Sequence, residues 1–217
     1  MLNTWLDPIA IAIVLAGTLL ATLLRCGLAD TRIALGVLRG LLEPSFDVPQ
    51  AKANLALQID GIADDGFVRA EPHHFGDSEF DSLSDTMISQ RSIQSLHGEH
   101  QKFKEARLAR AQTAIRVFDC AAELAPVLGL AGTLVALGQA QGAGPQEGGL
   151  VGAIATAVVT TLYGLVTANF LFAPIGGAIA RKSRKEERDR DEVLEWLAHG
   201  IRQTGVPGTP DTARQAA

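Results

Sequence analysis

The sequence predicts an all-α integral membrane protein with three transmembrane helices and a helical cytoplasmic domain. Of its 217 residues, 47% are hydrophobic and 20% are charged, which suits a membrane protein with a sizeable water-exposed part. Three stretches contain no Asp, Glu, Lys or Arg, namely 8–24, 124–143 and 148–180. They are about 17, 20 and 33 residues long, against the roughly 20 residues that cross a bilayer as a helix. One uniform soluble domain is therefore excluded.

The first transmembrane helix is assigned to residues 1–27. Its apolar stretch is short, so a buried helix or a signal peptide is the alternative. A signal peptide fits poorly, because no basic residue precedes the stretch and no clear cleavage site follows it. Cys26 and Cys120 fall at predicted cytoplasmic ends of spans, where we expect them to be reduced packing residues.

The distribution of Lys and Arg predicts the orientation. These residues follow the first span, precede the second and follow the third, whereas none precedes the first span and none lies in the loop between the last two. Because cytoplasmic loops are rich in Lys and Arg, the N-terminus and that loop are predicted to be periplasmic. The chain after the first span then divides into a cytoplasmic domain (28–118), the second span (119–141), a periplasmic loop (142–149), the third span (150–180), a cytoplasmic helix (181–202) and a disordered tail (203–217).

The cytoplasmic domain changes charge midway. Residues 43–99 contain 11 acidic and 3 basic residues, whereas residues 100–118 are basic with one acidic exception. The acidic lobe either docks a cytoplasmic partner or is a solvated face, and contact with anionic lipid headgroups is one interpretation of the basic part. Apolar spacing predicts a helix that ends at Gly66, then a loop as far as Phe80, and a helix again from Met87.

Histidines in this domain suggest a metal site only weakly. In HGEH, His97 and His100 are three residues apart on a predicted exposed helix, and such pairs are more often solvated than metal-bound. The pair His73 and His74 falls in the predicted loop, and the same interpretation applies. We therefore expect no metal.

The second and third spans each carry a stripe of small residues at helical spacing. In lipid, smooth faces of this kind let another helix approach closely, since packing drives the association. The two stripes either pack on each other or receive a partner helix, and two whole stripes exceed what one crossing needs. Packing against a partner helix is predicted for Ala125, Gly129, Gly132, Ala136, Ala157, Gly164 and Ala168.

Hydroxyl groups accompany the stripes. Thr156, Thr160, Tyr163 and Thr167 form a polar ridge on the third span, although a threonine in such a helix can bond its own backbone a turn earlier. Thr133 and Thr161 lie within the small stripes and would face whatever helix docks there. The core of each span lacks a group that binds and releases a proton near neutral pH, so an ion carrier must come from another molecule.

The last two spans resemble the MotA/TolQ/ExbB proton-channel family. The resemblance lies in VFDCAAELAPVLGLAGTLVALG (117–138) and IATAVVTTLYGLVTANFLFAPIG (154–176). The TTLYG motif, Asn169 and the FAPIG end are most similar to MotA and PomA, the flagellar stator subunits. The three-span topology instead resembles TolQ and ExbB, because a MotA has four spans.

The resemblance implies an inner-membrane proton-channel and stator subunit that couples ion-motive force to mechanical work, by rotation. It implies a ring, as a homopentamer, around a dimer of a MotB-, TolR- or ExbD-like single-span partner whose transmembrane Asp carries the proton. It places Thr133 and Thr161 at pore-lining positions, and the polar ridge of the third span adds Thr160 and Tyr163 to the predicted ion pathway. Pro126 and Pro174 match prolines linked to conformational change. Membrane lipid is the other expected partner, and no cofactor or nucleic acid is expected.

Two other functional classes compete with this one. A membrane scaffold without ion flow would explain the small stripes but not the threonine pair at the family's positions. An enzyme is poorly supported, because the sequence contains no phosphate loop of the GxxxxGK[ST] kind.

Overall fold

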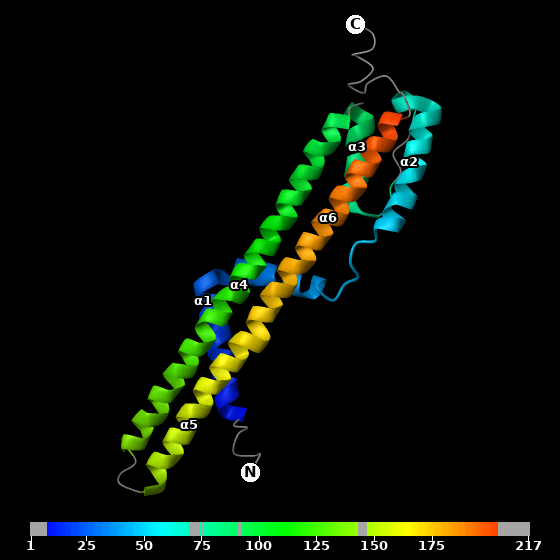
Figure 1. Cartoon of the computed structure of the whole chain (residues 1–217). Helices are drawn as coiled ribbons and strands as arrows, with labels where there is room; N and C mark the ends of the chain where they lie inside the picture. The colour runs from blue at the N-terminus through cyan, green and yellow to red at the C-terminus, as the bar shows by residue number, and fades with distance from the viewer. Residues whose placement is uncertain (1–7, 70–73, 75, 91–92, 143–146, 204–217) are drawn as a thin grey trace. The chain divides into compact units, whose positions relative to one another are not determined.

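The computed structural model describes residues 8–69, 74, 76–90, 93–142 and 147–203, and within these every regular element is a helix (Figure 1). This confirms the all-α prediction. Residues 204–217 of the predicted tail (203–217) and residues 143–146 of the predicted periplasmic loop lie outside the described residues, whereas Gln203 is the last residue of a helix. In chain order the elements are α1 (Pro8–Gly40), α2 (Val48–Arg69), α3 (Ser78–Gln90), α4 (Ile93–Gly142), α5 (Glu147–Val166), the π-helix η2 (Thr167–Phe172) and α6 (Ala173–Gln203).

The chain forms two compact units. The first, called the span unit here, comprises Met1–Glu43 and Arg110–Arg181; the second, called the charged unit, comprises Pro44–Ala109 and Lys182–Ala217. Helices α4 and α6 contribute residues to both. The charged unit corresponds to most of the segment that the sequence places in the cytoplasm.

Three helices are long and apolar enough to cross a membrane, as the sequence predicts: α1, α4 and the continuous helix of α5, η2 and α6. In the most apolar stretch of each, only 17%, 22% and 22% of the residues are buried within the chain. Large apolar side chains are left uncovered, with Leu24 78% exposed and Phe170 80% exposed. Such a surface is costly in water, so lipid or other protein chains must cover it.

Helix α1 is interrupted at Gly27. The backbone of Gly27 has φ 84° and ψ 163°, outside the helical region and with a positive φ that only glycine adopts at little cost. Beyond the break, the Thr31 hydroxyl donates to the Gly27 carbonyl at 2.8 Å. Before it, the buried hydroxyls of Thr18 and Thr22 donate to carbonyls one turn earlier, at 2.7 Å each, so α1 buries no unpaired hydroxyl at these positions.

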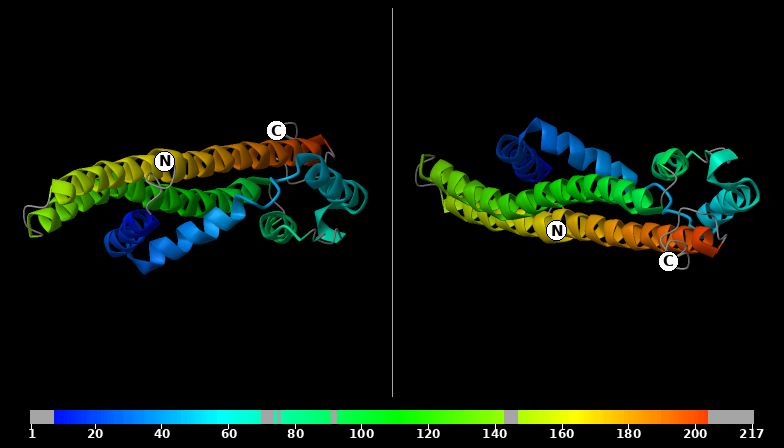
Figure 2. Two further views of the ribbon diagram at one scale, coloured as in Figure 1. Left: turned by 90° about the horizontal axis from the view of Figure 1, so that it is seen from below. Right: turned by 90° about the horizontal axis from the view of Figure 1, so that it is seen from above.

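Helices α4 and α5 run side by side in the span unit (Figures 1 and 2). A buried cluster joins α4 to the π-helix η2 that follows α5, and it consists of Ala121, Ala125, Ala168 and Phe172. A second cluster in the same unit joins Ala34 of α1 to Ala114 of α4 and Ile179 of α6. Alanine makes up most of both clusters, which permits close helix packing.

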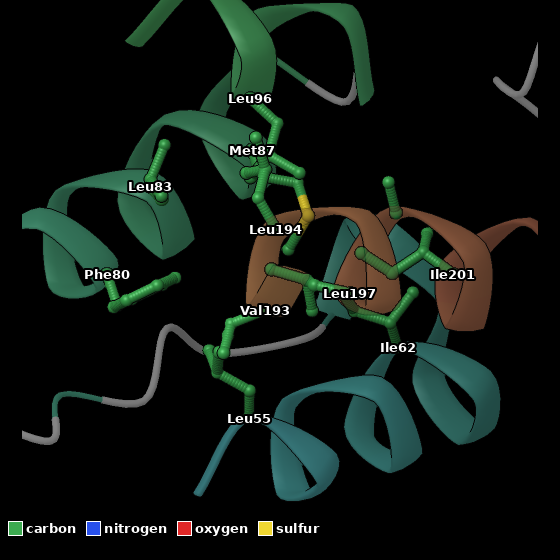
Figure 3. Packing of buried hydrophobic residues seen from close by; sticks show 11 residues of the cluster. Leu55, Ile62, Phe80, Leu83, Met87, Leu96, Val193, Leu194, Leu197 and Ile201 are labelled. Atoms are coloured by element: carbon green, nitrogen blue, oxygen red, sulfur yellow. The ribbon is translucent and has the colours of Figure 1, made fainter. Parts of the chain in front are cut away.

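The charged unit has its own hydrophobic core (Figure 3). Helices α2, α3 and the first part of α4 contribute Leu55, Phe80 and Leu96, and the last part of α6 contributes Leu197, each no more than 1% exposed. The core brings together segments that are more than 100 residues apart in the chain. The remaining buried members are Ile62, Leu83, Met87, Val193, Leu194, Ala198 and Ile201.

Two helix boundaries in this unit differ from the sequence prediction. Helix α2 continues past Gly66 to Arg69, and α3 begins at Ser78 rather than at Met87. The start of α3 follows from Asp77, whose carboxylate accepts hydrogen bonds from the N–H groups of Glu79 and Phe80 at 3.0 and 3.3 Å. The sequence DSEF, an N-cap residue before an acidic first turn, is the signal that could have placed this start.

Candidate functional site

The candidate site is built on the closest approach of α4 and α5. A methyl carbon added at Gly129 would lie 2.8 Å from the Thr160 carbonyl oxygen and 3.3 Å from the Cα atom of Thr161. A methyl carbon added at Gly164 would lie 2.6 Å from the carbonyl oxygen of Ala125. Because even one methyl group meets backbone atoms here, the two helices approach this closely only with glycine at both positions.

The small stripes of the second and third spans therefore pack on each other over much of their length, which is one of the two alternatives that the sequence leaves open. Ala125 is fully buried, Ala157 and Ala168 are 8% and 4% exposed, and Gly132 lies against the Thr160 side chain. Ala136 is half-buried. The contact of these residues with a partner helix stays a prediction, and for the buried ones the same face is already covered by a helix of their own chain.

The hydroxyls of the candidate pathway bond their own helices. Thr133 donates to the Leu130 carbonyl at 2.6 Å. Thr160 and Thr161 both donate to the Ala157 carbonyl, at 2.9 and 3.3 Å. Such bonds satisfy a hydroxyl without a partner molecule, and the lone pairs of the oxygen remain free to accept a hydrogen bond.

Burial separates these threonines. Thr160 is 6% exposed and lies against Gly132, so it belongs to the contact between α4 and α5. Thr133, Thr161 and Tyr163 are half-buried, which leaves part of each side chain accessible. The roles of all four in an ion pathway stay predictions, and Thr133 and Thr161 are the better placed to meet another molecule.

Both prolines lie in distorted or tightly packed helix. Pro126 interrupts α4, and its Cα atom would lie 3.2 Å from a methyl carbon added at Gly164. Pro174 lies two residues after the end of the π-helix, whose C-cap residue Ala173 donates its N–H to the Ala168 carbonyl five residues earlier. This π-helix is absent from the sequence prediction, although Pro174 is a signal for it, because a proline cannot donate to the carbonyl four residues before it.

Charged side chains in the span unit gather at one end of the spans. Arg25 of α1 donates to Glu123 of α4 at 3.2 Å, and Arg116 donates to Asp30 at 3.4 Å. These four residues, with Gln112, Ile115, Asp119 and both cysteines, line a cavity of about 590 Å³. Cys26 and Cys120 are free thiols that lie within hydrogen-bond reach of each other. No group of three or more His, Cys, Asp or Glu among the described residues could hold a metal ion.

The contact between α4 and α5 thus consists of two closely packed helices with small residues between them and hydroxyl groups at the edge. It contains no carboxylate within residues 124–143 or 148–180.

Residues 73–192, more than half of the chain, match the model of the MotA/TolQ/ExbB proton channel family. The chain belongs to this family. The match confirms the resemblance seen in the sequence, and with three membrane-crossing helices it makes the chain a multi-pass member of the MotA/TolQ/ExbB family.

Relatives and solved structures agree with the family. The chain is 27% identical over 201 residues to Motility protein A of Cereibacter sphaeroides, which covers 89% of this chain and 77% of the relative. It is 32% identical over 81 residues to Motility protein A of Borreliella burgdorferi, covering 37% and 31%.

Its fold is similar to a chain of C. jejuni MotAB, with a TM-score of 0.79, 16% identity, and coverage of 92% of this chain and 82% of that one. It is also similar to a chain of the flagellar MotAB stator complex from Bacillus subtilis, with a TM-score of 0.77, 22% identity, and coverage of 91% and 79%. At these identities the likeness shows a shared fold within the MotA/TolQ/ExbB family.

Proposed function

We propose that this chain is the proton-channel and stator subunit of a bacterial inner-membrane motor. In this proposal a homopentamer surrounds a dimer of a single-span MotB-, TolR- or ExbD-like protein, whose transmembrane Asp carries the proton. The observation that carries the proposal is that α4 and α5 present hydroxyls and glycines but no ionisable carboxylate within their apolar parts. A protein of a proton-channel family built in this way needs the acid of a partner.

The hydrogen bonds of Thr133 and Thr161 suggest how such an acid is accommodated. When the partner's Asp is protonated, its O–H can donate to a threonine oxygen while the threonine continues to donate to its own carbonyl. When the Asp is ionised, the threonine hydroxyl turns from the carbonyl to the carboxylate, because hydrogen bonds to an ionised acceptor are about twice as strong as neutral ones. The hydroxyl thus exchanges one acceptor for another as the proton leaves.

The proposed mechanical work results when this exchange of hydrogen bonds is repeated on successive subunits of the homopentamer. An ionised Asp is costly in the membrane unless donors or water reach it, and protonation removes that cost. Equivalent sites on successive subunits would then be occupied in turn, driven by the transmembrane potential at about 2.3 kcal/mol per charge per 100 mV and by the pH gradient. The orientation that the Lys and Arg distribution predicts places the N-terminus in the periplasm.

Thr161→Val tests the role of the hydroxyl. The substitution keeps the shape and removes the donor, so we expect proton flux to fall about tenfold to hundredfold, the equivalent of a lost hydrogen bond to a charged group of about 1.5–3 kcal/mol. The chain and its single-span partner would be reconstituted together in liposomes that contain a pH-sensitive dye. Unchanged flux in Thr161→Val would remove Thr161 from the mechanism.

The same helix offers a matched control. Thr156 is exposed on α5 and donates to the Gly152 carbonyl at 3.1 Å, so Thr156→Val makes the same chemical change five residues away. We expect its flux to equal that of the wild type. Native mass spectrometry of the co-purified complex tests the stoichiometry separately, and any ratio other than five chains to two partner chains contradicts the proposed assembly.

A non-conducting membrane scaffold is the second candidate. Two observations favour it: the small stripes are already used within the chain, and the threonine hydroxyls bond their own helices. A complex that assembles with its partner but carries no proton flux above that of protein-free liposomes would identify a scaffold.

A further inference from the structure

A histidine is buried between two carboxylates in the charged unit. The His100 side chain, on α4, is 5% exposed. Its Nδ1 atom lies 2.6 Å from Oε1 of Glu79 on α3, and its Nε2 atom lies 2.8 Å from Oδ1 of Asp191 on α6. The solvated histidine that the sequence predicts for HGEH is therefore wrong at this position, and one imidazole ring joins three helices.

The two contacts define the protonation state of the ring. An ionised carboxylate only accepts hydrogen bonds, and a neutral imidazole has one donor and one acceptor nitrogen. A neutral His100 could donate to Glu79 or to Asp191, and its other nitrogen would then place a lone pair against a carboxylate oxygen. Both bonds form together only when the ring carries two protons and a positive charge.

The surrounding charges favour that cation. Five carboxylates meet three permanent cations in this cluster, so the carboxylates are in excess. The cations are Lys104 and Arg107 of α4 and Arg190 of α6. The carboxylates are Asp77 and Glu79 of α3 and Glu186, Glu187 and Asp191 of α6.

These surroundings raise the pKa of His100 above its usual value. The hydrogen bond with Glu79 is the largest cause, burial of the ring opposes it, and the hydrogen bond and charge of Asp191 add to the increase. His100 lies outside the membrane-spanning part of its helix. A 50-residue helix is about 75 Å long, more than twice the thickness of the hydrocarbon core.

We propose that His100 is a proton-binding site through which the pH around the charged unit controls the attachment of α3 to α4 and α6. In the topology proposed above this compartment is the cytoplasm, but the inference does not depend on ion conduction. Glu79 and Asp77 are the acidic groups by which α3 is held, and the Glu79 side chain is 2% exposed. When His100 loses its proton, a buried carboxylate loses a charged donor, and α3 is the element that this loss loosens.

The direction of the pH effect follows from the raised pKa. The stabilisation from His100 is fully present below the unfolded pKa of about 6.5 and is lost as the pH rises through the higher folded value. As the pH falls through the folded pKa of His100, the attachment of α3 to α4 and α6 becomes stronger, and as the pH rises through that value, the attachment becomes weaker.

Hydrogen exchange of the full chain in lipid nanodiscs tests the proposal. Exchange of the α3 amides would be measured by mass spectrometry from pH 6 upward and corrected for the intrinsic rate of an unstructured peptide at each pH. We expect the corrected protection of α3 to fall several-fold as the pH rises past neutrality, while amides of α4 and α5 in the span unit keep theirs. Protection of α3 that does not change with pH overturns the proposal.

Two substitutions attribute the effect to His100. In His100→Gln we expect α3 to exchange at the fast, alkaline rate at every pH, because Gln carries no positive charge between the two carboxylates and does not titrate. His199→Gln is the control, since His199 is exposed on α6 and contacts Gln203. A pH profile in His199→Gln that is flattened to the same extent would overturn the assignment.

A second variant keeps the test decisive if His100→Gln does not fold. Asp191→Asn leaves His100 in place and removes one of its two charged acceptors, at a position that is 42% exposed and therefore tolerant. We expect the midpoint of the α3 transition to move to lower pH. An unchanged midpoint would show that His100 is not the group that titrates.

Discussion

Gly129 of α4 and Gly164 of α5 face each other at the closest approach of the two helices. A methyl carbon built on Gly129 lies 3.2 Å from the Cα atom of Gly164, and one built on Gly164 lies 3.1 Å from the Cα atom of Gly129. Neither position has room for a side chain. This pair of glycines therefore sets the distance between the helices that carry the candidate site.

Gly129→Ala tests this contact. The added methyl group would lie 2.8 Å from the Thr160 carbonyl oxygen, so the helices must separate, at a cost of about 1–3 kcal/mol. Thermal unfolding of the full chain in detergent measures the loss. Gly152→Ala is the control, because a methyl group at Gly152 on α5 meets nothing within 4 Å. Equal melting temperatures for the two variants would contradict a tight contact at Gly129.

Thr160 and Thr161 are adjacent but should respond differently to the same substitution. Thr160 packs against Gly132, with its Cγ2 atom 3.5 Å from a methyl carbon built there. Thr160→Val keeps this shape, so we expect proton flux close to that of the wild type, whereas Thr161→Val loses it. A similar loss in both variants would place Thr160 in the pathway, as predicted from its position in the polar ridge.

Arg190 should be among the most sensitive residues of the charged unit. Its guanidinium donates to Glu79 at 2.8 Å and to Asp77 at 3.0 Å, and it lies 4.4 Å above the ring of Phe46. Arg190→Ala leaves the buried Glu79 with one cation fewer, and we expect a loss of about 3–5 kcal/mol in the unfolding free energy of this unit.

Two further variants serve as references for the loss of unfolding free energy in Arg190→Ala. Arg188 is exposed on the same helix, and Arg188→Ala should leave the unfolding free energy nearly unchanged. Arg190→Lys should fall between the two, because a lysine keeps the charge but cannot form the paired bonds of a guanidinium. Denaturant titration followed by the fluorescence of Trp196, which packs against the core of this unit, provides the measurement.

Acid should also destabilise the charged unit. Burial of Glu79 disfavours its charged form, but the hydrogen bond from His100 and the charges of Arg107 and Arg190 outweigh burial and hold its pKa below the usual value. A lowered pKa contributes stability that is present above the unfolded value, about 4.3 for Glu, and is lost as the pH falls through the folded value. Unfolding measured from pH 6 down to pH 2 should show this loss, and Glu79→Gln should reduce it. A flat profile would contradict the ion cluster.

Pro174 should maintain the π-helix before it. Pro174→Ala restores an N–H group that can donate to the carbonyl four residues earlier, which favours the α-helical register. Conversion of a π turn to an α turn rotates the following helix by about one residue, roughly 100°. Side chains of α6 would then leave their present neighbours on α4.

A cysteine crosslink measures this rotation. A methyl carbon built on Gly176 lies 3.3 Å from Oδ1 of Asp119, so Gly176→Cys and Asp119→Cys should form a disulfide efficiently once Cys26 and Cys120 are replaced by Ala. We expect a lower yield when Pro174→Ala is added. The same yield with and without Pro174 would show that the proline does not determine the register.

The spans and the family could be predicted from the sequence, because both depend on local composition. An uncharged run long enough to cross a bilayer is visible in one dimension, and so are the motifs around Thr133 and Thr161. The function of the small stripes could not be resolved in the same way. Helical spacing shows that a face is smooth, but it does not show whether the helix that covers the face belongs to the same chain.

The buried cluster of charged residues around His100 could not be predicted from the sequence either. His100 contacts Glu79, 21 residues away, and Asp191, 91 residues away. The sequence around each of these residues indicates only the polar face of a helix. Only the shared core of α2, α3, α4 and α6 brings them together, and that core depends on contacts between distant segments.

The interruption at Gly27 has a mechanical consequence for α1. An unbroken helix behaves as a stiff shaft, because each turn is bonded to the next. At Gly27 the helical series of backbone angles stops. A rotation of one half of α1 can therefore be taken up by changes in φ and ψ of Gly27 and need not be transmitted to the other half. The two parts of α1 can thus change their angle at Gly27 while each keeps its own contact with α4, the first through Arg25 and Glu123 and the second through Ala34.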